Sequence, residues 1–334
     1  MAKKNNPAVS VIIAMYNAED FISLCLIGLA NQTLQDFEII VVDDCSTDNS
    51  LKIVEGFSAT FGGRLKVMKL SSNSGCPGIP RNFAMEKARG KYIYFLDSDD
   101  LLGETALEDF YNVAENFNAD VIHSEKCFAF VEEGGEVAAK ISSTQTGEFV
   151  TKPTLETFDI GKRVNDFVAK KFLWQAWGKL YRRQFLVDNK IKFSAISTYE
   201  DFIFVFMCIV AAKNYVRVPF VNCYYRVRKN SLSHEALDSI EMSKTMIAVV
   251  SELDKFMNGK KFFHENFQCR YAVLDFFIQL RLEVIAKGLF VISDIDPAMV
   301  FNFFRAKIFS ANANDNAALT SYLFVKTVLN SIKN

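Results

Sequence analysis

Short, almost uninterrupted apolar runs in the first hundred residues constrain the fold of this chain most strongly. They cover residues 9–15, 38–42 and 92–96, and each gives way to polar residues. A strand that is covered by helices on both faces has a continuous apolar run rather than an alternating one. The runs therefore predict buried strands of a parallel sheet.

Helical patterns separate the strands. Residues 19–31 have apolar positions near helical spacing. Further helices are expected from about residue 46 to 61, from the end of a loop at residue 80 to residue 88, and over residues 104–117. Residues 65–70 are expected to form another strand. This alternation predicts right-handed crossovers and an α/β fold with a mostly parallel, Rossmann-like sheet flanked by helices.

The pattern changes further along the chain. Residues 121–147 are expected to form strands with a hairpin turn at 132–135, and almost everything after about residue 231 has a helical pattern. We expect one domain over residues 1–230 and a helical C-terminal region over residues 231–334. No linker rich in Pro, Gly or Ser marks this boundary.

Composition limits the class of protein. The 38 basic and 39 acidic residues leave no basic excess for nucleic-acid binding. Seven cysteines without a CxxC pair are typical of small buried side chains in a reducing compartment. The longest apolar run, residues 203–212, is too short to span a bilayer, and the run at 9–15 is too short for a secretory signal. We expect a cytoplasmic protein without a transmembrane helix.

A cluster of acidic residues, Asp97, Asp99 and Asp100, directly follows the buried run at 92–96. Ligands of open α/β sheets bind beyond the carboxyl ends of the strands. Three carboxylates so close together repel one another unless a cation lies among them, and Mn²⁺ or Mg²⁺ suits oxygen ligands and substrate phosphates. The alternative is that Asp99 or Asp100 caps the helix expected near residue 104.

Two other strands end in polar or aromatic residues. Tyr16 can stack on a nucleobase, or it can simply cover the edge of the sheet. Asp44 can accept hydrogen bonds from a uracil imide or a ribose hydroxyl. Helix capping by Ser46 or Asp48 does not account for Asp44, which precedes the turn.

Arg81 lies in an unfavourable place for a cation. Pro80 suits the first position of a helix, which puts Arg81 in the first turn, where the helix dipole disfavours positive charge. This placement predicts an anionic partner, either a diphosphate or one of the aspartates. An exposed arginine without a role is the alternative.

Four ordered motifs resemble those of the family 2 glycosyltransferases with the GT-A fold, of the bacterial surface-polysaccharide type: VSVIIAMYNAEDFI, FEIIVVDDCSTDNS, NSG followed by RN, and YIYFLDSDD. The resemblance covers residues 8–120 closely and 170–235 more loosely. Cys45 and Pro80 depart from it, because the family often has Gly and Ala there.

The resemblance implies a nucleotide-sugar donor at the strand ends. Asp97 and Asp99 would form the Asp-x-Asp that holds Mn²⁺ or Mg²⁺ and the ribose, with Asp99 the direct ligand and His234 completing the metal shell. A surface or capping role is the alternative for His234. The residues implied to contact the nucleotide or diphosphate are Ala14, Tyr16, Asn17, Asp44, Arg81, Asp97 and Arg226.

The resemblance also implies a catalytic base before the apolar helix at 203–212. Glu200 and Asp201 match the Glu-Asp pair of the family, whose aspartate takes the proton of the acceptor hydroxyl. A helix N-terminus favours the ionised carboxylate. We therefore favour Asp201 over Glu200, although the spacing of Thr198 and Asp201 also fits a capping box.

The segment WQAWGKLYRR resembles the W-x-K-L-Y-R segment of the family. Trp174 and Trp177, with Lys179 beside them, are candidates for an acceptor site, because aromatic faces can stack on sugars. Core tryptophans with Lys179 at the surface are the alternative. The C-terminal helices are expected to pack on the catalytic domain, to form a homodimer or to contact a membrane peripherally.

The expected function is metal-dependent, inverting transfer of a sugar, from a UDP-sugar rather than a GDP- or dTDP-sugar, to a hydroxyl of a glycan or lipid-linked acceptor. The expected place is the cytoplasm, at the inner face of the membrane. The absence of a Gln-x-x-Arg-Trp motif argues against a processive synthase. A nucleotidyltransferase is one alternative, although its first loop is usually rich in Gly and basic residues. A non-catalytic module that binds a sugar nucleotide or a protein partner is the other.

Overall fold

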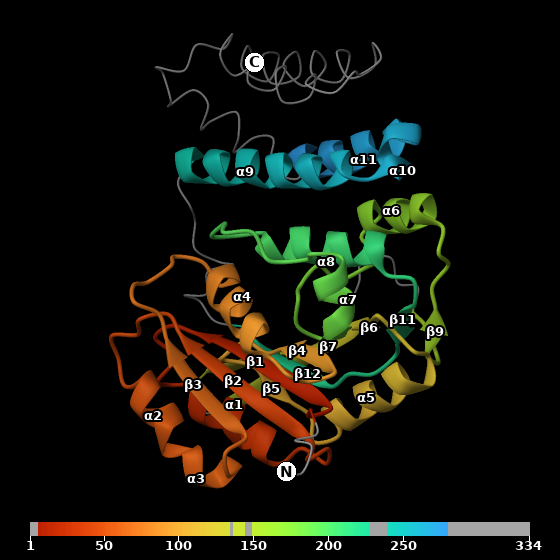
Figure 1. Cartoon of the computed structure of the whole chain (residues 1–334). Helices are drawn as coiled ribbons and strands as arrows, with labels where there is room; N and C mark the ends of the chain where they lie inside the picture. The colour runs from red at the N-terminus through yellow and green to blue at the C-terminus, as the bar shows by residue number, and fades with distance from the viewer. Residues whose placement is uncertain (1–5, 134–135, 144–148, 228–238, 280–334) are drawn as a thin grey trace. The chain divides into compact units, whose positions relative to one another are not determined.

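The computed structural model describes residues 6–133, 136–143, 149–227 and 239–279 (Figure 1). The chain divides into two compact units, Met1–Ser231 and Leu232–Asn334.

The first unit is built on an eight-stranded sheet with the order β3-β2-β1-β4-β10-β6-β11-β9. Strands β1 to β4 are parallel to one another, whereas β10 is inserted antiparallel between β4 and β6. The mostly parallel sheet predicted from the sequence is thus confirmed. The strand bounds are β1 Val9–Met15, β2 Phe37–Asp43, β3 Leu65–Lys69, β4 Tyr92–Phe95, β6 Val121–Ser124, β9 Thr154–Leu155, β10 Lys179–Arg182 and β11 Tyr215–Val218.

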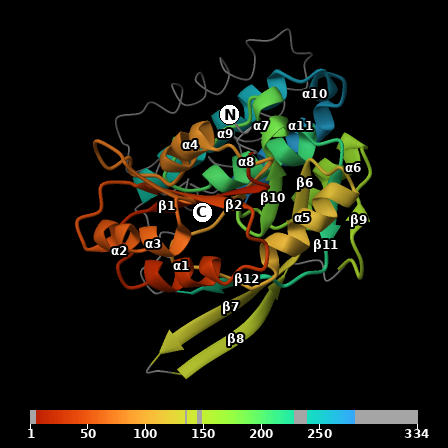
Figure 2. The same ribbon diagram turned by 60° about the horizontal axis from the view of Figure 1, so that its bottom comes forward.

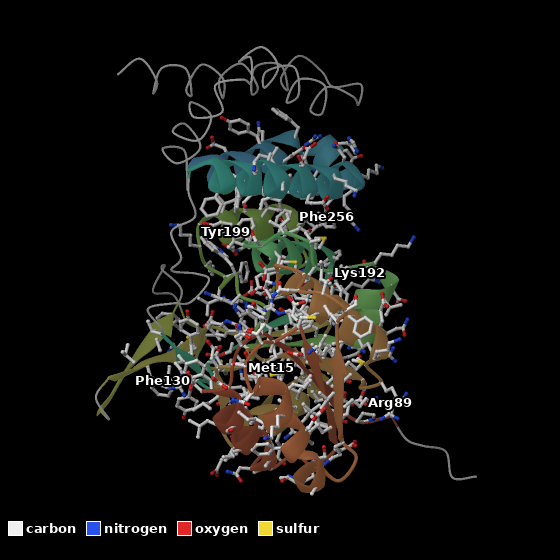
Figure 3. All side chains as sticks on the ribbon, turned by 90° about the vertical axis from the view of Figure 1, so that its left-hand side faces the viewer. Met15, Arg89, Phe130, Lys192, Tyr199 and Phe256 are labelled. Atoms are coloured by element: carbon white, nitrogen blue, oxygen red, sulfur yellow. The ribbon has the colours of Figure 1, made fainter. Side chains whose placement is uncertain are left out.

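Helices cover both faces of this sheet (Figures 1 and 2). Alternate residues of β1, from Val9 to Met15, share one apolar core with the buried faces of α1 and α5, while α4 packs against β1 and β2 on the opposite face. Figure 3 shows Met15 inside this unit. The helix bounds are α1 Ile22–Ala30, α2 Ser50–Gly56, α3 Ser58–Phe61, α4 Gly78–Lys87, α5 Ala106–Asn116, α6 Ile160–Val168, α7 Arg183–Asp188 and α8 Glu200–Ala211.

The start of α4 differs from the prediction. The helix begins at Gly78, so Pro80 is its third residue rather than its first. Proline is tolerated there because the first N–H groups of a helix have no acceptor within the helix. Arg81 therefore comes one turn into α4.

A second, four-stranded sheet has the order β5-β12-β7-β8. Its strands are β5 Leu101–Leu102, β7 Lys126–Glu133, β8 Glu136–Ser143 and β12 Cys223–Arg226, and Figure 2 shows β7 and β8 side by side. The turn predicted between them includes residues 134–135, which lie outside the described residues. Because β12 pairs with β5, this sheet brings the end of β12 next to the acidic turn that follows β4.

The second unit contains α9 Ser239–Asn258, α10 Lys261–Glu265 and α11 Phe267–Gln279, which pack on one another. Arg270 of α11 holds Asp254 of α9 at 2.5 Å between Nη2 and Oδ1. The predicted helical character is confirmed over these residues, and residues 280–334 lie outside the described part of the chain. Among the described residues, no helix is both long enough and apolar enough to cross a membrane.

Candidate active site

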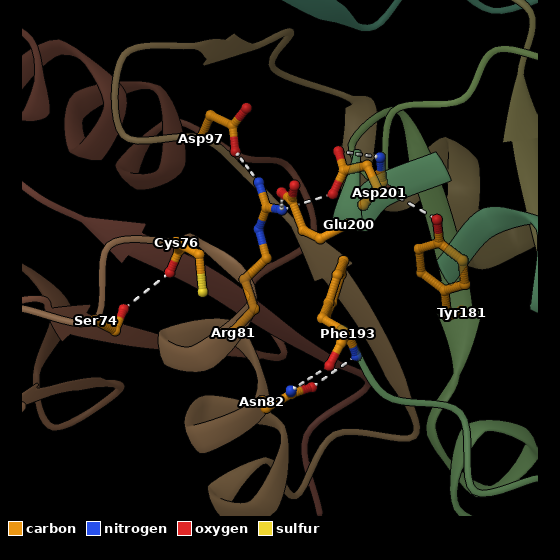
Figure 4. A network of polar contacts seen from close by, with 10 residues as sticks. Ser74, Cys76, Arg81, Asn82, Asp97, Tyr181, Phe193, Glu200 and Asp201 are labelled. Atoms are coloured by element: carbon orange, nitrogen blue, oxygen red, sulfur yellow. Dashed lines mark hydrogen bonds and ion pairs between the residues drawn. The ribbon is translucent and has the colours of Figure 1, made fainter. Parts of the chain in front are cut away.

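A buried arginine joins three carboxylates beyond the carboxyl ends of the central strands (Figure 4). Arg81 Nη2 lies 2.8 Å from Asp97 Oδ1, while Nη1 lies 3.0 Å from Glu200 Oε1 and 2.6 Å from Asp201 Oδ1. The aspartate partner predicted for Arg81 is therefore present. A contact between Arg81 and a diphosphate stays a prediction.

This cluster holds more negative than positive charge, and its pKa values reflect that. Burial alone would lower the pKa of Arg81, but the charges of Asp201, Asp97 and Glu200 outweigh it and raise the pKa. Burial and then the charge of Asp201 raise the pKa of Glu200 to about 8. Glu200 therefore holds its proton more readily than an exposed glutamate does.

Asp201 is held by contacts from outside its own helix. Its Oδ2 accepts a hydrogen bond from the Ala176 N–H at 2.9 Å. The capping box predicted at this helix is wrong, because α8 begins at Glu200 and Tyr199 in the left-handed region (φ 67°) occupies the cap position without a side-chain bond. The Thr198 hydroxyl is buried without a hydrogen-bond partner in the described part of the chain.

Asn82, which follows Arg81 in the RN motif, fixes the loop around Phe193. The Asn82 side chain donates to the Phe193 backbone oxygen at 2.8 Å and accepts from the Phe193 N–H at 2.9 Å. The centroid of the Phe193 ring lies 5.2 Å from the Arg81 guanidinium. A Cβ on Gly78 would come within 2.7 Å of the Ser194 oxygen, so only glycine allows this approach. Sequence reasoning missed Asn82 as a positioning residue, although it adjoins Arg81 in the RN motif.

The ends of β1 and β2 present the residues predicted to face the nucleotide. Tyr16 is exposed, Ala14 is partly covered, and Asn17 accepts a hydrogen bond from a backbone N–H in the loop after β2. Both carboxylate oxygens of Asp44 accept hydrogen bonds from Ser74. One accepts from the Ser74 N–H at 2.8 Å and the other from the Ser74 hydroxyl at 2.7 Å. Sequence reasoning missed Ser74, although it lies in the NSG motif.

The acidic turn after β4 has an accessible and a buried side. The Asp97 side chain is 31% exposed and Asp99 is half-buried, whereas buried Asp100 accepts the Arg226 backbone N–H at 2.9 Å. The capping alternative for Asp99 and Asp100 is wrong, because α5 follows Thr105 at its cap position. Arg226 Nε donates to the Asp99 carbonyl at 3.2 Å, so in this structure Arg226 binds the turn itself.

The guanidinium of Arg226 also lies 4.6 Å from the ring centroid of Phe130, which Figure 3 shows on β7. Aromatic packing and hydrogen bonds together fix this arginine beside the acidic turn. His234, the other residue predicted from that segment, lies outside the described residues.

The candidate acceptor residues lie deeper than predicted. Trp177 is buried and stacks on Tyr225 with centroids 5.5 Å apart, whereas Trp174 is half-buried and packs edge-on against Phe202. Lys179 is only 1% exposed, so the alternative is wrong in placing Lys179 at the surface, whereas the buried Trp177 agrees with its core tryptophan. An acceptor role for these residues stays a prediction. In this conformation, of the three residues only Trp174 is more than marginally exposed.

The sheet order and the strand-end carboxylates define a GT-A fold. The sequence model described as glycosyl transferase family 2 matches residues 10–173. The chain belongs to this family.

Three comparisons give the range of similarity. A poly(ribitol-phosphate) beta-glucosyltransferase of Bacillus spizizenii is 33% identical over 226 residues, which cover 66% of this chain and 32% of that protein. Residues 1–349 of S. aureus TarS in complex with UDP-GlcNAc match with a TM-score of 0.64 and 23% identity, covering 97% of this chain and 91% of that one. The mannosyltransferase PcManGT from Pyrobaculum calidifontis, in complex with GDP-Man and Mn²⁺, matches with a TM-score of 0.54 and 16% identity, covering 98% and 87%. The two structures show the fold, and the chain spans about a third of the length of the first curated relatives.

Proposed function

We propose that this chain is an inverting glycosyltransferase of bacterial surface-polysaccharide synthesis. It moves a sugar from a UDP-sugar to a hydroxyl of a glycan or lipid-linked acceptor. The observation that carries the proposal is the placement of Asp201 beside Arg81 and Asp97 at the carboxyl ends of the strands. A relative named for poly(ribitol-phosphate) and a structural neighbour that binds UDP-GlcNAc support the class of acceptor and donor.

Asp201 is the proposed general base. Its side chain is 20% exposed and Glu200 is 7% exposed, so Asp201 is the carboxylate within reach of an acceptor. The acceptor oxygen attacks the anomeric carbon while the bond from that carbon to the diphosphate breaks, and Asp201 takes the hydroxyl proton. One displacement from the opposite face inverts the anomeric configuration. Glu200 remains beneath Arg81 and helps to orient it.

The acidic turn after β4 fits a divalent cation. Asp97 and Asp99 supply carboxylate oxygens on its accessible side, the ligands that Mn²⁺ and Mg²⁺ prefer. Among the described residues, no three His, Cys, Asp or Glu side chains gather as a metal-binding group. Donor phosphates, and His234 if it comes near, would therefore complete the shell. A bound cation would neutralise charge on the leaving diphosphate.

The remaining strand ends form the proposed donor site. Asp44 and Tyr16 face the base and ribose, together with Ala14 and Asn17. Arg226 lies near the diphosphate. The support is their common position at the ends of β1, β2 and β12.

We assign this activity to a catalytic domain at residues 1–230, acting in the cytoplasm at the inner face of the membrane. The seven cysteines, all free thiols, support a reducing compartment. Homodimer formation and peripheral membrane contact through residues 231–334 stay predictions.

The test measures UDP release from a panel of UDP-sugars with Mn²⁺ and a poly(ribitol-phosphate) acceptor. We expect acceptor-dependent release that falls at least 100-fold in Asp201→Asn, since a general base contributes about 10²–10⁴-fold. Asp188→Asn, at an exposed aspartate of α7, is the matched control and should retain full activity. Metal-dependent formation of a nucleotide sugar from a nucleoside triphosphate would instead identify a nucleotidyltransferase. Donor binding without turnover would identify a binding module.

A further inference from the structure

Lys179 is a buried cation that the proposed mechanism does not use. It is the first residue of β10, it is 1% exposed, and its ammonium donates to the backbone oxygen of Gln175 at 2.6 Å. Burial of an ammonium group is costly unless it is paired. An apolar side chain would fill this space at a lower cost in free energy, so the buried ammonium group points to a role for its charge.

The Gln175 oxygen and the Ala176 N–H belong to the same peptide group. Lys179 binds the oxygen end, and Asp201 Oδ2 accepts the N–H end at 2.9 Å. In a planar trans peptide the oxygen and the N–H point in opposite directions. One rigid group therefore connects the buried ammonium to the carboxylate of the proposed base.

We propose that Lys179 is a positioning residue for Asp201, whose ammonium orients and polarises the Gln175–Ala176 peptide so that its N–H holds the Asp201 carboxylate. The inference rests on the proposed function, in which Asp201 is the base. A positive charge at a peptide oxygen strengthens the N–H as a donor, because linked hydrogen bonds polarise one another in a low-dielectric interior. With Arg81 on its Oδ1, the Asp201 carboxylate is then fixed at both oxygens.

Neighbouring contacts hold the same peptide segment. The Tyr181 hydroxyl donates to the Ala176 oxygen at 3.0 Å, and the Gly178 N–H donates to the Tyr94 hydroxyl at 3.2 Å. These contacts are uncharged and keep the segment in place without Lys179. Removal of the ammonium alone should thus affect Asp201 more than the fold.

The electrostatics around Lys179 are consistent with this role. Burial lowers the pKa of Lys179 to about 7, and the charge of Asp201 opposes that shift, so the ammonium form on which the proposal depends is the main form below about pH 7. The other titratable groups that face Lys179 are Cys208 of α8, Cys127 of β7, Cys223 of β12 and His123 of β6. Burial raises the pKa of the Cys208 and Cys223 thiols and lowers the pKa of His123, so these three groups are neutral near pH 7. Asp201 is therefore the anion whose charge raises the pKa of Lys179.

The test replaces Lys179 by methionine, which has a similar shape and no charge. We expect kcat for UDP release to fall at least 10-fold while KM for the UDP-sugar changes less than 2-fold and the unfolding midpoint does not fall. Lys171→Met is the matched control, since Lys171 is a half-buried lysine that pairs with Asp166 instead. It should retain wild-type kcat.

An unchanged kcat in Lys179→Met overturns the inference, and so does a parallel loss of kcat, donor affinity and stability, which would show a purely structural role. Lys179→Gln is measured by the same criteria and decides the question if the methionine variant does not fold. Wild-type enzyme in the same assay separates the two proposals. Absence of turnover in the wild type contradicts the proposed function, whereas turnover that Lys179 does not affect contradicts only the role of Lys179.

Discussion

Arg81 Nη1 and Asp201 Oδ1 lie 2.6 Å apart, although 120 residues separate them in the sequence. The ion pair joins α4 to the first turn of α8. Because Arg81 also binds Asp97 after β4, the proposed base is fixed relative to the acidic turn that would hold the donor. The geometry of the site depends on this one guanidinium.

Arg81→Met should therefore destabilise the protein strongly. It leaves Asp201, Asp97 and Glu200 without their cation, and the loss of one partner from a buried ion pair costs about 3 kcal/mol or more. Urea unfolding followed by circular dichroism measures the change. Lys192→Met, which breaks the exposed pair with Glu86, is the control and should have little effect. Equal stability of Arg81→Met and wild type would show that the guanidinium does not stabilise the cluster.

Asp44→Asn should weaken nucleotide binding. Both Asp44 oxygens accept from Ser74, and an amide would present N–H to one of those donors and displace the loop. We expect the Kd for UDP, measured by calorimetry, to rise about 10-fold, which corresponds to about 1.4 kcal/mol. Ser71→Ala, at an exposed serine of the same loop, should leave the Kd unchanged. An unchanged Kd in Asp44→Asn would remove Asp44 from the proposed donor site.

Glu38 should make stability depend on acid pH. Burial acts to raise its pKa, but hydrogen bonds from Lys66, Arg89 and Ser10 outweigh burial and lower the pKa from 4.5 to about 2. The folded state therefore binds this proton less readily than the unfolded chain. The resulting stability is fully present above about pH 5 and is lost as the pH falls towards 2.

Glu38→Gln should accordingly lose about 2 kcal/mol of unfolding free energy at pH 7, less than the full pKa shift implies, because Lys66 and Arg89 lie partly in water. The difference from wild type should narrow between pH 5 and pH 2, as measured by denaturant unfolding at each pH. A difference that stays constant over this range would contradict the pKa assigned to Glu38.

Removal of divalent cations should stop the reaction if Asp97 and Asp99 hold a metal. We expect EDTA to abolish UDP release and Mn²⁺ to restore it. In Asp99→Asn the Mn²⁺ concentration for half-maximal activity should rise at least 10-fold, because a neutral amide oxygen binds a hard cation more weakly than a carboxylate. Asp188→Asn is again the control. Full activity in EDTA would show that the reaction needs no divalent cation.

The sequence predicted the sheet well because buried parallel strands have continuous apolar runs. Every residue of β2 is buried, including Glu38 and Asp43, and β1 is almost as fully buried. The common location of the residues at the strand ends could be predicted as well, since parallel strands place their carboxyl ends at one edge of the sheet. The inserted antiparallel strand β10 was not predicted, because its position depends on pairing with β4 and β6.

The contacts within the site could not be predicted in the same way. Residue type and helix position indicated that Arg81 needs an anion, but not that its partners include Asp201. The capping box at Thr198 was wrong because Asp201 binds a backbone N–H from a distant segment instead of one in its own helix. Burial of Trp177 and Lys179 likewise depends on β12 and α8, which lie far away in the sequence.

A crystal structure with UDP and Mn²⁺, with the metal located by its anomalous scattering, tests the central claim most directly. We predict one manganese peak that an Asp99 oxygen and the diphosphate both coordinate, with the uracil beside Asp44 and with Asp201 facing the terminal phosphate, where the sugar would be attached. Nucleotide and metal bound on another surface, with Asp44, Asp99 and Asp201 all distant from them, would contradict the account.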